Sequence, residues 1–285
     1  MAYDPFFLGD THEVPLPGLV GKTAEEALES GRVYDFTHFS IAMNKRRRFA
    51  IFSAACVDES RFLQVPRDNK SWHFDDRIGK ENQVGAEFYA NNEYDRGHLT
   101  RRKDVCWGER QEAEKANYDS FCYANIALQH HRFNTGIWNC LEDWILDSLD
   151  NDKKMIVITG PIHKESDEEY CGANGKPGCG ITIPFGFWKM VCYADRQQAL
   201  TCLSFLIRQG PDHPAETCAY QRWETYQVPL ATIAEEAGLA FVEQLHAANP
   251  LSFQPGDPRF VHHELAVEKQ LIAQPSDIVM SRDSK

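Results

Sequence analysis

The order of apolar segments predicts an α+β fold with a central antiparallel sheet flanked by helices. Two short runs rich in apolar and aromatic residues, Phe39 to Met43 and Phe49 to Cys56, predict a hairpin because the basic stretch Lys45–Arg48 joins them. Further strand-length runs follow in the second half of the chain, after a segment with helical spacing. We therefore expect antiparallel strands with helices packed against them.

The other elements are assigned in chain order. Residues 1–30 predict an irregular lead-in that contains prolines and ends in a short helix, Thr23 to Ser30. Glu59 to Ala90 is rich in loop-forming residues, and Glu109 to Ala116 has the pattern of a short helix. The later strands and the last helix are expected at Met155 to Thr159, Gly186 to Ala194, Ala199 to Ile207 and Leu230 to Ala237.

One segment in the middle of the chain has the spacing of an amphipathic helix. From Asn134 to Leu149 the apolar residues recur at helical intervals. Asn134 is then expected at the start of the helix, with Glu142 about two turns further on, roughly 12 Å along the axis. Two other interpretations stay open, in which Asn134 caps the helix and Glu142 lies on a solvated helix face.

The most informative motif is DRGHL at residues 95–99, because Asn134 follows its His98 after 36 residues and Glu142 follows eight residues later. A neutral histidine accepts a proton from water and contributes ~10²–10⁴-fold to a rate. The Asn134 amide oxygen suits Mg²⁺, which prefers oxygen ligands, and its neutrality leaves the charge of the ion available to a phosphate. Arg67 would balance charge on the phosphate oxygens, and Glu142 suits an outer position that holds a metal-bound water. Together these residue types suit phosphodiester hydrolysis.

Length and composition fit a single globular enzyme. The chain has 285 residues, of which 42% are hydrophobic, so it can bury one large mixed core. Its longest apolar runs, such as Met155 to Ile158 and Leu203 to Ile207, are far shorter than the ~20 residues of a membrane-spanning helix. The N-terminus lacks a basic start followed by a long apolar stretch. We therefore expect a cytoplasmic protein without a membrane span.

Nine cysteines are spread along the chain without any CxxC pair, which predicts reduced thiols. Cys171 and Cys179 bracket a glycine-rich turn, so a local disulfide or a metal loop stays open, although two cysteines are a weak zinc signal. The pairs His130-His131 and His262-His263 are expected at the surface or in packing, since adjacent side chains do not converge on one ligand.

The net charge of −12 opposes the approach of a polyanion at long range. The placement of the charges reduces this objection. We expect the basic run Lys45–Arg48 to form a hairpin turn. The second basic run consists of Arg101, Arg102 and Lys103 and follows the DRGH motif directly, so we expect it to face the phosphates of a substrate.

Three ordered motifs carry a resemblance to a known family: DRGHL at residues 95–99, NIALQ at 125–129 and FNTGIWNCLE at 133–142. Over roughly residues 30–245, the chain resembles the DNA/RNA non-specific endonucleases of the endonuclease G-like, ββα-metal (His-Me finger) class. One departure is Leu128, where the family usually has proline before the glutamine. Further similar pieces are Thr159–Ile162, Ile183-Pro184, Phe187–Lys189, Val228–Leu230 and Gly238–Phe241.

The resemblance implies a role for each matched residue. His98 is then the general base, Asn134 the direct Mg²⁺ ligand and Glu142 the residue that holds a metal-bound water. Arg67 takes the place of the family's transition-state arginine, with Arg61 as the alternative. Mn²⁺ is the alternative metal. Structural support of the site is implied for Asp95, Arg96, Asn125 and Gln129.

The resemblance and the composition lead us to expect three parts: a lead-in over residues 1–30, a DNA/RNA non-specific endonuclease domain over residues 31–248 and a C-terminal extension over residues 249–285. Prolines become frequent from about Asn249, which marks the last boundary. Within the extension, a short helix is expected from His263 to Ala273.

The resemblance implies an endonuclease that cuts DNA and RNA by water attack, with little selectivity for sequence or sugar, and leaves 5′-phosphate and 3′-hydroxyl ends. Such an enzyme endangers its own cell, so we expect restraint by a regulatory protein, an inhibitor or assembly into a homo-oligomer. A stress or antiviral defence effector would fit. Two alternatives stay open: a catalytically silent nucleic-acid-binding or assembly module that keeps the fold, and a phosphodiesterase that acts on small nucleotides.

Overall fold

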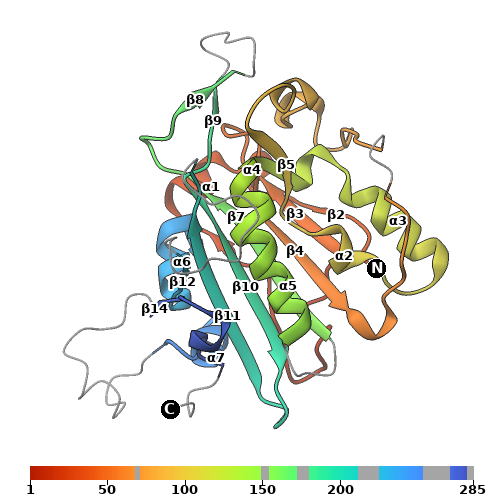
Figure 1. The fold of residues 1–285 in the computed structure, drawn as a ribbon, viewed down its shortest axis with the longest axis vertical. Coiled ribbons are helices and arrows are strands. Elements are labelled where there is room, and N and C mark those ends of the chain that lie inside the picture. The colour runs from red at the N-terminus through yellow and green to blue at the C-terminus, as the bar shows by residue number, and fades with distance from the viewer. Residues whose placement is uncertain (68–70, 149–153, 172–179, 211–224, 253–269, 281–285) are drawn as a thin grey trace.

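The computed structural model describes residues 1–67, 71–148, 154–171, 180–210, 225–252 and 270–280. Eight strands of these residues form one antiparallel sheet in the order β14-β12-β11-β10-β7-β4-β3-β2 (Figure 1). This arrangement confirms the α+β fold with a central antiparallel sheet. The strands span Val33–Asp35 (β2), Phe39–Met43 (β3), Ala50–Asp58 (β4), Lys154–Ile162 (β7), Gly186–Ala194 (β10), Leu200–Arg208 (β11), Thr225–Gln227 (β12) and Gln270–Leu271 (β14).

The apolar runs of the sequence correctly predict the long strands, and the observed bounds of β3 and β10 equal the predicted ones. β7 is longer than predicted, because it continues past Thr159 through Gly160 and Pro161. A Cβ atom on Gly160 would lie 2.3 Å from the Ile51 carbonyl oxygen of β4. The glycine therefore allows the two backbones to approach closely, which an apolar-run prediction does not register.

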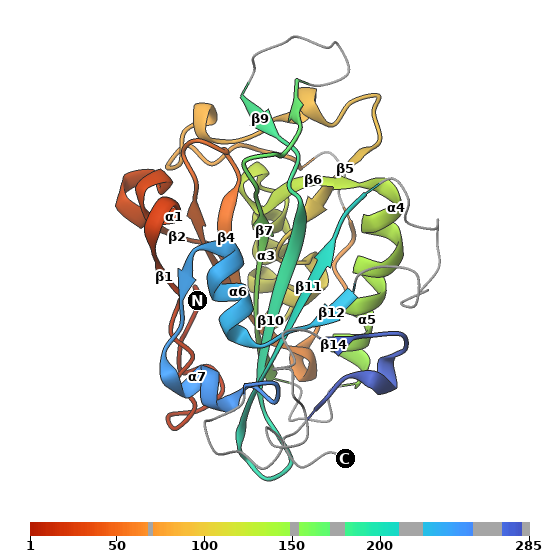
Figure 2. The ribbon, with the colours of Figure 1, turned by 90° about the vertical axis from the view of Figure 1, so that its left-hand side faces the viewer.

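The sheet separates two hydrophobic cores, with α4 (His131–Phe133) and α5 (Asn139–Ser148) on one side and α6 (Leu230–Ala237) and α7 (Glu243–Ala248) on the other (Figure 2). Successive side chains of a strand point to opposite faces. On β10, Phe187 and Val191 accordingly belong to the first core, whereas Trp188 and Met190 belong to the second. Because the central strands are buried on both faces, their sequences are nearly continuous apolar runs.

A ββα unit packs on the first face. β5 (Tyr94–His98) pairs antiparallel with β6 (Ile126–His130), which leads directly into α4 (His131–Phe133). A π-helical turn at Asn134–Trp138 follows, and α5 (Asn139–Ser148) completes the unit. The helix expected from Asn134 therefore begins earlier, at His131. Gly136, with φ −98° and ψ −114°, lies outside the helical region and interrupts the regular turns.

The helix predicted at Thr23 to Ser30 is shorter and ends earlier than expected. It spans Gly21–Glu26 (α1), and Glu29 and Ser30 have positive φ angles of 46° and 57° in the turn that follows. The remaining helices are α2 (Arg102–Val105), α3 (Arg110–Ser120), α6 (Leu230–Ala237, as predicted) and α7 (Glu243–Ala248). Short 3₁₀ turns lie at Leu28–Gly31, Glu59–Arg61, Lys80–Asn82, Ala86–Phe88, Tyr123–Asn125 and Pro275–Asp277, and short strand pairs join β1 (Gly18–Leu19) to β13 (Leu239–Ala240) and β8 (Glu169–Tyr170) to β9 (Ile181–Thr182).

The C-terminal segment contributes to the sheet. β14 pairs with β12 at the sheet edge, and Ile272 and Ile278 are buried in the first core. Of the helix expected from His263 to Ala273, residues 263–269 lie outside the described part of the chain, and Gln270–Leu271 form a strand instead. That expectation is wrong at its described end, because backbone pairing with β12 takes precedence over local pattern. None of the helices in the described segments is long and apolar enough to cross a membrane.

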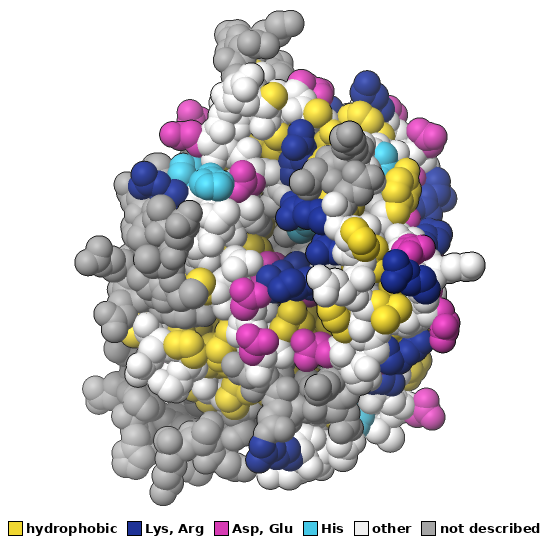
Figure 3. Space-filling view, turned by 45° about the vertical axis from the view of Figure 1, so that its right-hand side comes forward, with side chains coloured by type: hydrophobic (Ala, Val, Ile, Leu, Met, Phe, Trp, Pro, Cys, Tyr) yellow, Lys and Arg dark blue, Asp and Glu magenta, His cyan; other side chains and the backbone are white. Residues whose placement is uncertain are grey.

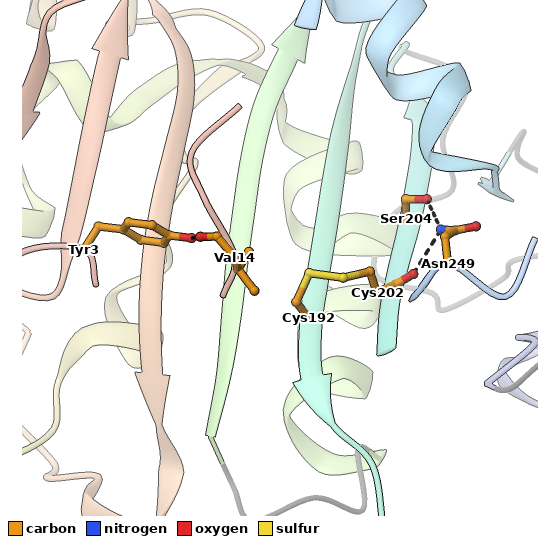
Figure 4. The surroundings of a disulfide bond; sticks show 6 residues. All are labelled: Tyr3, Val14, Cys192, Cys202, Ser204 and Asn249. Atoms are coloured by element: carbon orange, nitrogen blue, oxygen red, sulfur yellow. Dashed lines mark hydrogen bonds between the residues drawn. A yellow bond between two sulfur atoms is a disulfide. The ribbon is translucent and has the colours of Figure 1, made fainter. Parts of the chain in front are cut away.

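The expectation of reduced thiols is wrong for part of the cysteines. Cys192 of β10 and Cys202 of β11 are directly opposite in the strand register and form a disulfide (Figure 4). Cys140 and Cys171 are each in a disulfide bond as well. The strand register, which cysteine spacing alone does not show, brings Cys192 and Cys202 together. Among the described cysteines, Cys56, Cys106 and Cys122 are free thiols, and all three are buried.

Candidate active site

His98 is the last residue of β5 and lies half-buried against aromatic rings. The centre of its imidazole is 5.3 Å from a ring centre of Trp72 and 5.8 Å from that of Phe121. The preceding residue is a glycine, and a Cβ atom on Gly97 would lie 2.2 Å from the side chain of Gln129, so any other residue would force a shift. Gly97 thus lets β5 approach β6 closely and fixes the position of His98.

The surroundings of His98 keep its imidazole neutral. Burial, and then the positive charges of Arg67, Arg102 and Arg101, lower the pKa of His98 to about 3. A hydrogen bond with the backbone of Ser120 acts in the opposite direction. The buried Nε2 atom has no hydrogen-bond partner in the part of the chain that the structure describes. The site therefore presents a neutral nitrogen that can accept a proton, and a bound phosphate would raise its pKa by offsetting the three cations.

The side-chain amide of Asn134 is oriented by Asp95. The Asn134 Nδ2 atom donates to Asp95 Oδ2 at 2.9 Å, and the His131 Nδ1 atom lies 2.9 Å from the same oxygen. An ionised carboxylate only accepts hydrogen bonds, so the amide nitrogen must face Asp95 and Oδ1 must face away from it. Phe133, the neighbouring residue, stacks on Phe187 of the sheet at 5.5 Å and holds this turn in place.

Glu142 lies inside a network of buried charges, with a relative exposure of 9%. Its Oε1 atom is 3.3 Å from Lys189 Nζ, and its Oε2 atom is 3.6 Å from Arg101 Nε. Lys189 is 1% exposed and also donates to Thr159 Oγ1 at 2.8 Å. Asp104 lies nearby, and burial raises its pKa to about 6 against the effect of the Lys189 charge. The interpretation of Glu142 as part of a solvated helix face is therefore wrong.

The two candidate arginines lie in different places. The charge of Arg67 lowers the pKa of His98, which places this arginine close to the imidazole. Arg61 instead lies over the ring of Trp107 at 5.3 Å, and its carbonyl oxygen accepts from the Gly108 amide at 3.1 Å. Of the two arginines, Arg67 is therefore the one whose charge acts on His98. Its role in the transition state stays a prediction.

The basic run after the motif contacts mainly protein groups. Arg101 Nη2 donates to Asp143 Oδ1 at 2.6 Å, and Arg102 Nη1 donates to the Val65 carbonyl at 2.8 Å. Lys103 is exposed and borders a cavity of about 510 Å³ that is otherwise lined largely by acidic and apolar side chains. On the face shown in Figure 3, Lys and Arg side chains gather around a hollow, with Asp and Glu side chains beside them. Binding of phosphates by this run stays a prediction.

The residues expected to support the site surround the motif. Asn125 is fully buried, and its amide donates to the Thr100 carbonyl at 2.8 Å and accepts from the Thr100 amide at 3.0 Å. This pair of bonds fixes the chain directly after the motif. The guanidinium of Arg96 lies over the rings of Trp72 at 5.3 Å and Tyr89 at 5.7 Å. Gln129 fills the space that Gly97 leaves open.

Three residues of this region had no predicted role. Trp72 lies in the loop-rich stretch before the motif, where no periodic pattern indicates a contact with His98. No pattern in the sequence indicates the burial of Asp104. For Lys189 the sequence does contain a signal, because this residue occupies the inward-facing position between Phe187 and Val191 on a strand. Lysine is rarely buried without a charged partner, so this placement indicates an ion pair.

The oxygen atoms of the site fit a hard divalent cation. The Asn134 amide oxygen, which Asp95 orients away from itself, and the Glu142 carboxylate are the ligand types that Mg²⁺ accepts directly or through water. No group of three or more His, Cys, Asp or Glu side chains that could hold a metal occurs in the described ranges. The candidate metal site therefore depends on a single amide oxygen together with water.

Comparison with known proteins agrees with this geometry. The model of the DNA/RNA non-specific endonuclease family matches residues 22–248, and the chain belongs to this family of metal-dependent nucleases. A crystal structure of the EndoG/EndoGI complex matches with a TM-score of 0.57 and 21% identity, over 75% of this chain and 86% of that chain. This match confirms the ββα-metal fold.

Relatives in sequence include one uncharacterised protein and several nucleases. The protein y4fB of Sinorhizobium fredii is 32% identical over 84% of this chain and 39% of its own length. A nuclease of a Nostoc species is 24% identical over 57% of this chain and 56% of its length. The mitochondrial nuclease EXOG of Xenopus laevis is 23% identical over 60% of this chain and 47% of its length. The chain thus spans only about two fifths to just over half of the length of these relatives.

Proposed function

We propose that this chain is an endonuclease that hydrolyses phosphodiester bonds in DNA and RNA, with His98 as the general base and a Mg²⁺ ion at Asn134. The observation that carries the proposal is the unpartnered Nε2 atom of a neutral histidine in the same ββα unit as an amide oxygen that Asp95 turns away from itself. A non-catalytic binding module would not need either feature.

In the proposed reaction, His98 Nε2 accepts a proton from a water molecule while the water oxygen attacks the phosphorus. The bond from phosphorus to the 3′ oxygen breaks, and this oxygen takes up a proton, which leaves 5′-phosphate and 3′-hydroxyl ends. Arg67, close to His98, would balance the charge on the non-bridging oxygens. When bound, Mg²⁺ would polarise the scissile phosphate and stabilise the departing oxygen. Asn134 would hold the ion directly, and Glu142 would hold one of its waters.

The substrate would be recognised through its backbone. Contacts to phosphate carry little sequence information, so the enzyme would cut with weak sequence selectivity. Arg101 and Arg102 lower the pKa of His98 through their charges, and Lys103 follows them in the chain. The same charges would attract a phosphate to the imidazole and partly offset the net charge of −12.

The test is the nicking of supercoiled plasmid by the purified chain and its His98→Ala variant, with Mg²⁺, with Mn²⁺ and with a chelator. We expect cutting by the wild type only when a metal is present, and a fall of about 10²-fold or more in the variant. A wild type that binds plasmid but never cuts it with either metal would leave the silent binding module as the better reading. A dinucleotide assayed in parallel separates the endonuclease from a small-nucleotide phosphodiesterase.

Restraint by a partner is a further part of the proposal. The structural relative was solved in a complex of EndoG with EndoGI, which concerns the mechanism of EndoG inhibition. We propose that a protein inhibitor or self-assembly restrains this chain in the same way, as a stress or antiviral defence effector requires. Purified chain that is fully active when dilute, and unaffected by lysate of its own cells, would contradict this part.

The compartment in which the protein acts can also be tested. The N-terminal sequence gave the expectation of a cytoplasmic protein, whereas the disulfide between Cys192 and Cys202 favours an oxidising compartment. We propose that the chain acts where these cysteines stay oxidised. Thiol mapping in intact cells decides between the two.

A further inference from the structure

Lys189 is a buried lysine whose ammonium group points at the candidate site. It stands on β10 opposite Thr159 of β7 in the strand register, and its Nζ atom donates to Thr159 Oγ1 at 2.8 Å. The same atom lies 3.3 Å from Glu142 Oε1 and 4.8 Å from the ring centre of Trp138. Two central strands of the sheet therefore fix the position of this cation.

The carboxylate of Glu142 is held from both of its oxygens. Lys189 lies beside Oε1, and Arg101 lies beside Oε2 at 3.6 Å. Arg101 is itself held by Asp143 of the same helix at 2.6 Å. A glutamate on a helix normally has several rotamers, and losing this freedom costs free energy unless partners define one of them. Here one partner comes from the sheet and the other from the chain after the motif.

We propose that Lys189 is a positioning residue for hydrolysis, which locks the Glu142 carboxylate in the orientation that holds a metal-bound water. This inference rests on the proposed function. It assigns Lys189 a task that core packing alone does not require, because an apolar residue of similar length would fill the same space. It also assigns Arg101 to Glu142 in addition to the substrate phosphate.

The first test replaces Lys189 by methionine, which keeps the length of the side chain and removes its charge. Partners of this kind typically change metal affinity or activity by about 10-fold to 100-fold. We expect Lys189→Met to lower kcat by such a factor and to raise the Mg²⁺ concentration for half-maximal rate, with KM for a short duplex DNA unchanged. Lys154→Met is the matched control, since Lys154 is exposed at the end of β7 and lies over Phe7.

A double-mutant cycle shows whether Lys189 acts through Glu142. If it does, Lys189→Met in the Glu142→Gln background lowers kcat no further than Glu142→Gln alone. Independent losses that multiply would overturn the inference, and so would a Lys189→Met enzyme with the Mg²⁺ dependence of the wild type. If Lys189→Met does not fold, Thr159→Val removes only the hydrogen bond to Nζ, and the same shift in Mg²⁺ dependence is expected.

A binding measurement keeps this inference separate from the proposed function. Mn²⁺ binding to the wild type and to Lys189→Met, followed by electron paramagnetic resonance, needs no turnover. Weaker Mn²⁺ binding in the variant supports the positioning role even if the wild type cuts no substrate tested. Equal Mn²⁺ binding in the two proteins refutes it, whether or not the wild type is a nuclease.

Discussion

At the scale of single residues, the site depends on charges that control one another. Three arginines and burial keep His98 neutral, and Asp95 determines which atom of the Asn134 amide faces away from it. Lys189 and Arg101 each lie beside one oxygen of Glu142. Each candidate site residue thus has a neighbour that determines its protonation or its orientation, so under the proposed function substitutions of the neighbours should change the reaction rate without removing a reacting group.

Arg67 and Arg61 offer a matched pair of substitutions. We expect Arg67→Met to lower kcat by about 10²–10³-fold, as for loss of one group that stabilises transition-state charge. It should also raise the pKa of His98, because a nearby positive charge disappears. Arg61→Met should leave both quantities unchanged, since Arg61 lies over Trp107. Plasmid cleavage and an NMR titration of the histidines measure the two effects. A loss of rate in Arg61→Met alone would reverse the assignment.

At the scale of elements, the hairpin of β5 and β6 positions His98, and its close pairing depends on one glycine. The Gln129 side chain occupies the space beside Gly97, and neither polar atom of the Gln129 amide has a hydrogen-bond partner among the described residues. The Gln129 side chain is thus held beside Gly97 by shape and not by hydrogen bonds among the described residues. Any side chain at residue 97 would have to move either Gln129 or the strand that carries His98.

We therefore expect Gly97→Ala to lower the free energy of unfolding by about 1–3 kcal/mol, the usual cost of overpacking, and to reduce cleavage. Thermal and urea unfolding measure the first effect. Combining Gly97→Ala with Gln129→Ala should recover most of the stability, because the second change removes the clashing atoms. Gly210→Ala is the control, since a Cβ atom there meets nothing within 4 Å. Equal losses in both single variants would contradict the steric explanation.

A second prediction at this scale concerns the strand pair β10 and β11. The disulfide joins directly opposite residues of these strands. Alkylation of the protein denatured without reductant should modify Cys56, Cys106 and Cys122 and leave Cys192 and Cys202 unmodified, as peptide mass spectrometry can determine. After reduction, all five should react. Alkylation of Cys192 before reduction would contradict the disulfide and agree with the reduced thiols expected from the sequence.

At the scale of the whole molecule, several histidines are buried in their neutral form. Burial lowers the pKa of His38, His98 and His163 below the value of about 6.5 in an unfolded chain. His38 is fully buried, with its Nδ1 atom 2.8 Å from the Val105 carbonyl oxygen. The unfolded chain therefore binds more protons than the folded chain once the pH falls below about 6.5.

The expected result is an early loss of stability in acid. Below about pH 6.5 each of these histidines costs up to about 1.4 kcal/mol of stability per pH unit, until its folded pKa is reached. Asp104 acts in the opposite direction, because its raised pKa means that its contribution to stability is lost as the pH rises through about 6. The three histidines outweigh it. Urea midpoints at pH 8 and pH 5 test this, and an equal or higher midpoint at pH 5 would contradict it.

The sequence by itself determined the family and the α+β class, and it supplied the candidate site residues. Apolar runs and the ordered motifs around His98, Asn134 and Glu142 are local features, and hydrophobic periodicity and residue chemistry act locally. For the same reason β3, β10 and α6 were predicted with their observed bounds. The choice of Arg67 over Arg61 also came from sequence order, and it stays a prediction.

Only the tertiary structure decided which distant residues meet. The partners of Glu142, the disulfide between Cys192 and Cys202 and the strand at Gln270–Leu271 depend on sheet register, which sequence spacing does not reveal. The π-helical turn at Asn134–Trp138 likewise replaced the regular helix that the apolar pattern predicted. The pKa of His98 depends on burial and on three arginines, and these become its neighbours only when the chain has folded. Electrostatic and packing energies are set by distances in space, which is why they follow from the fold and not from the motif.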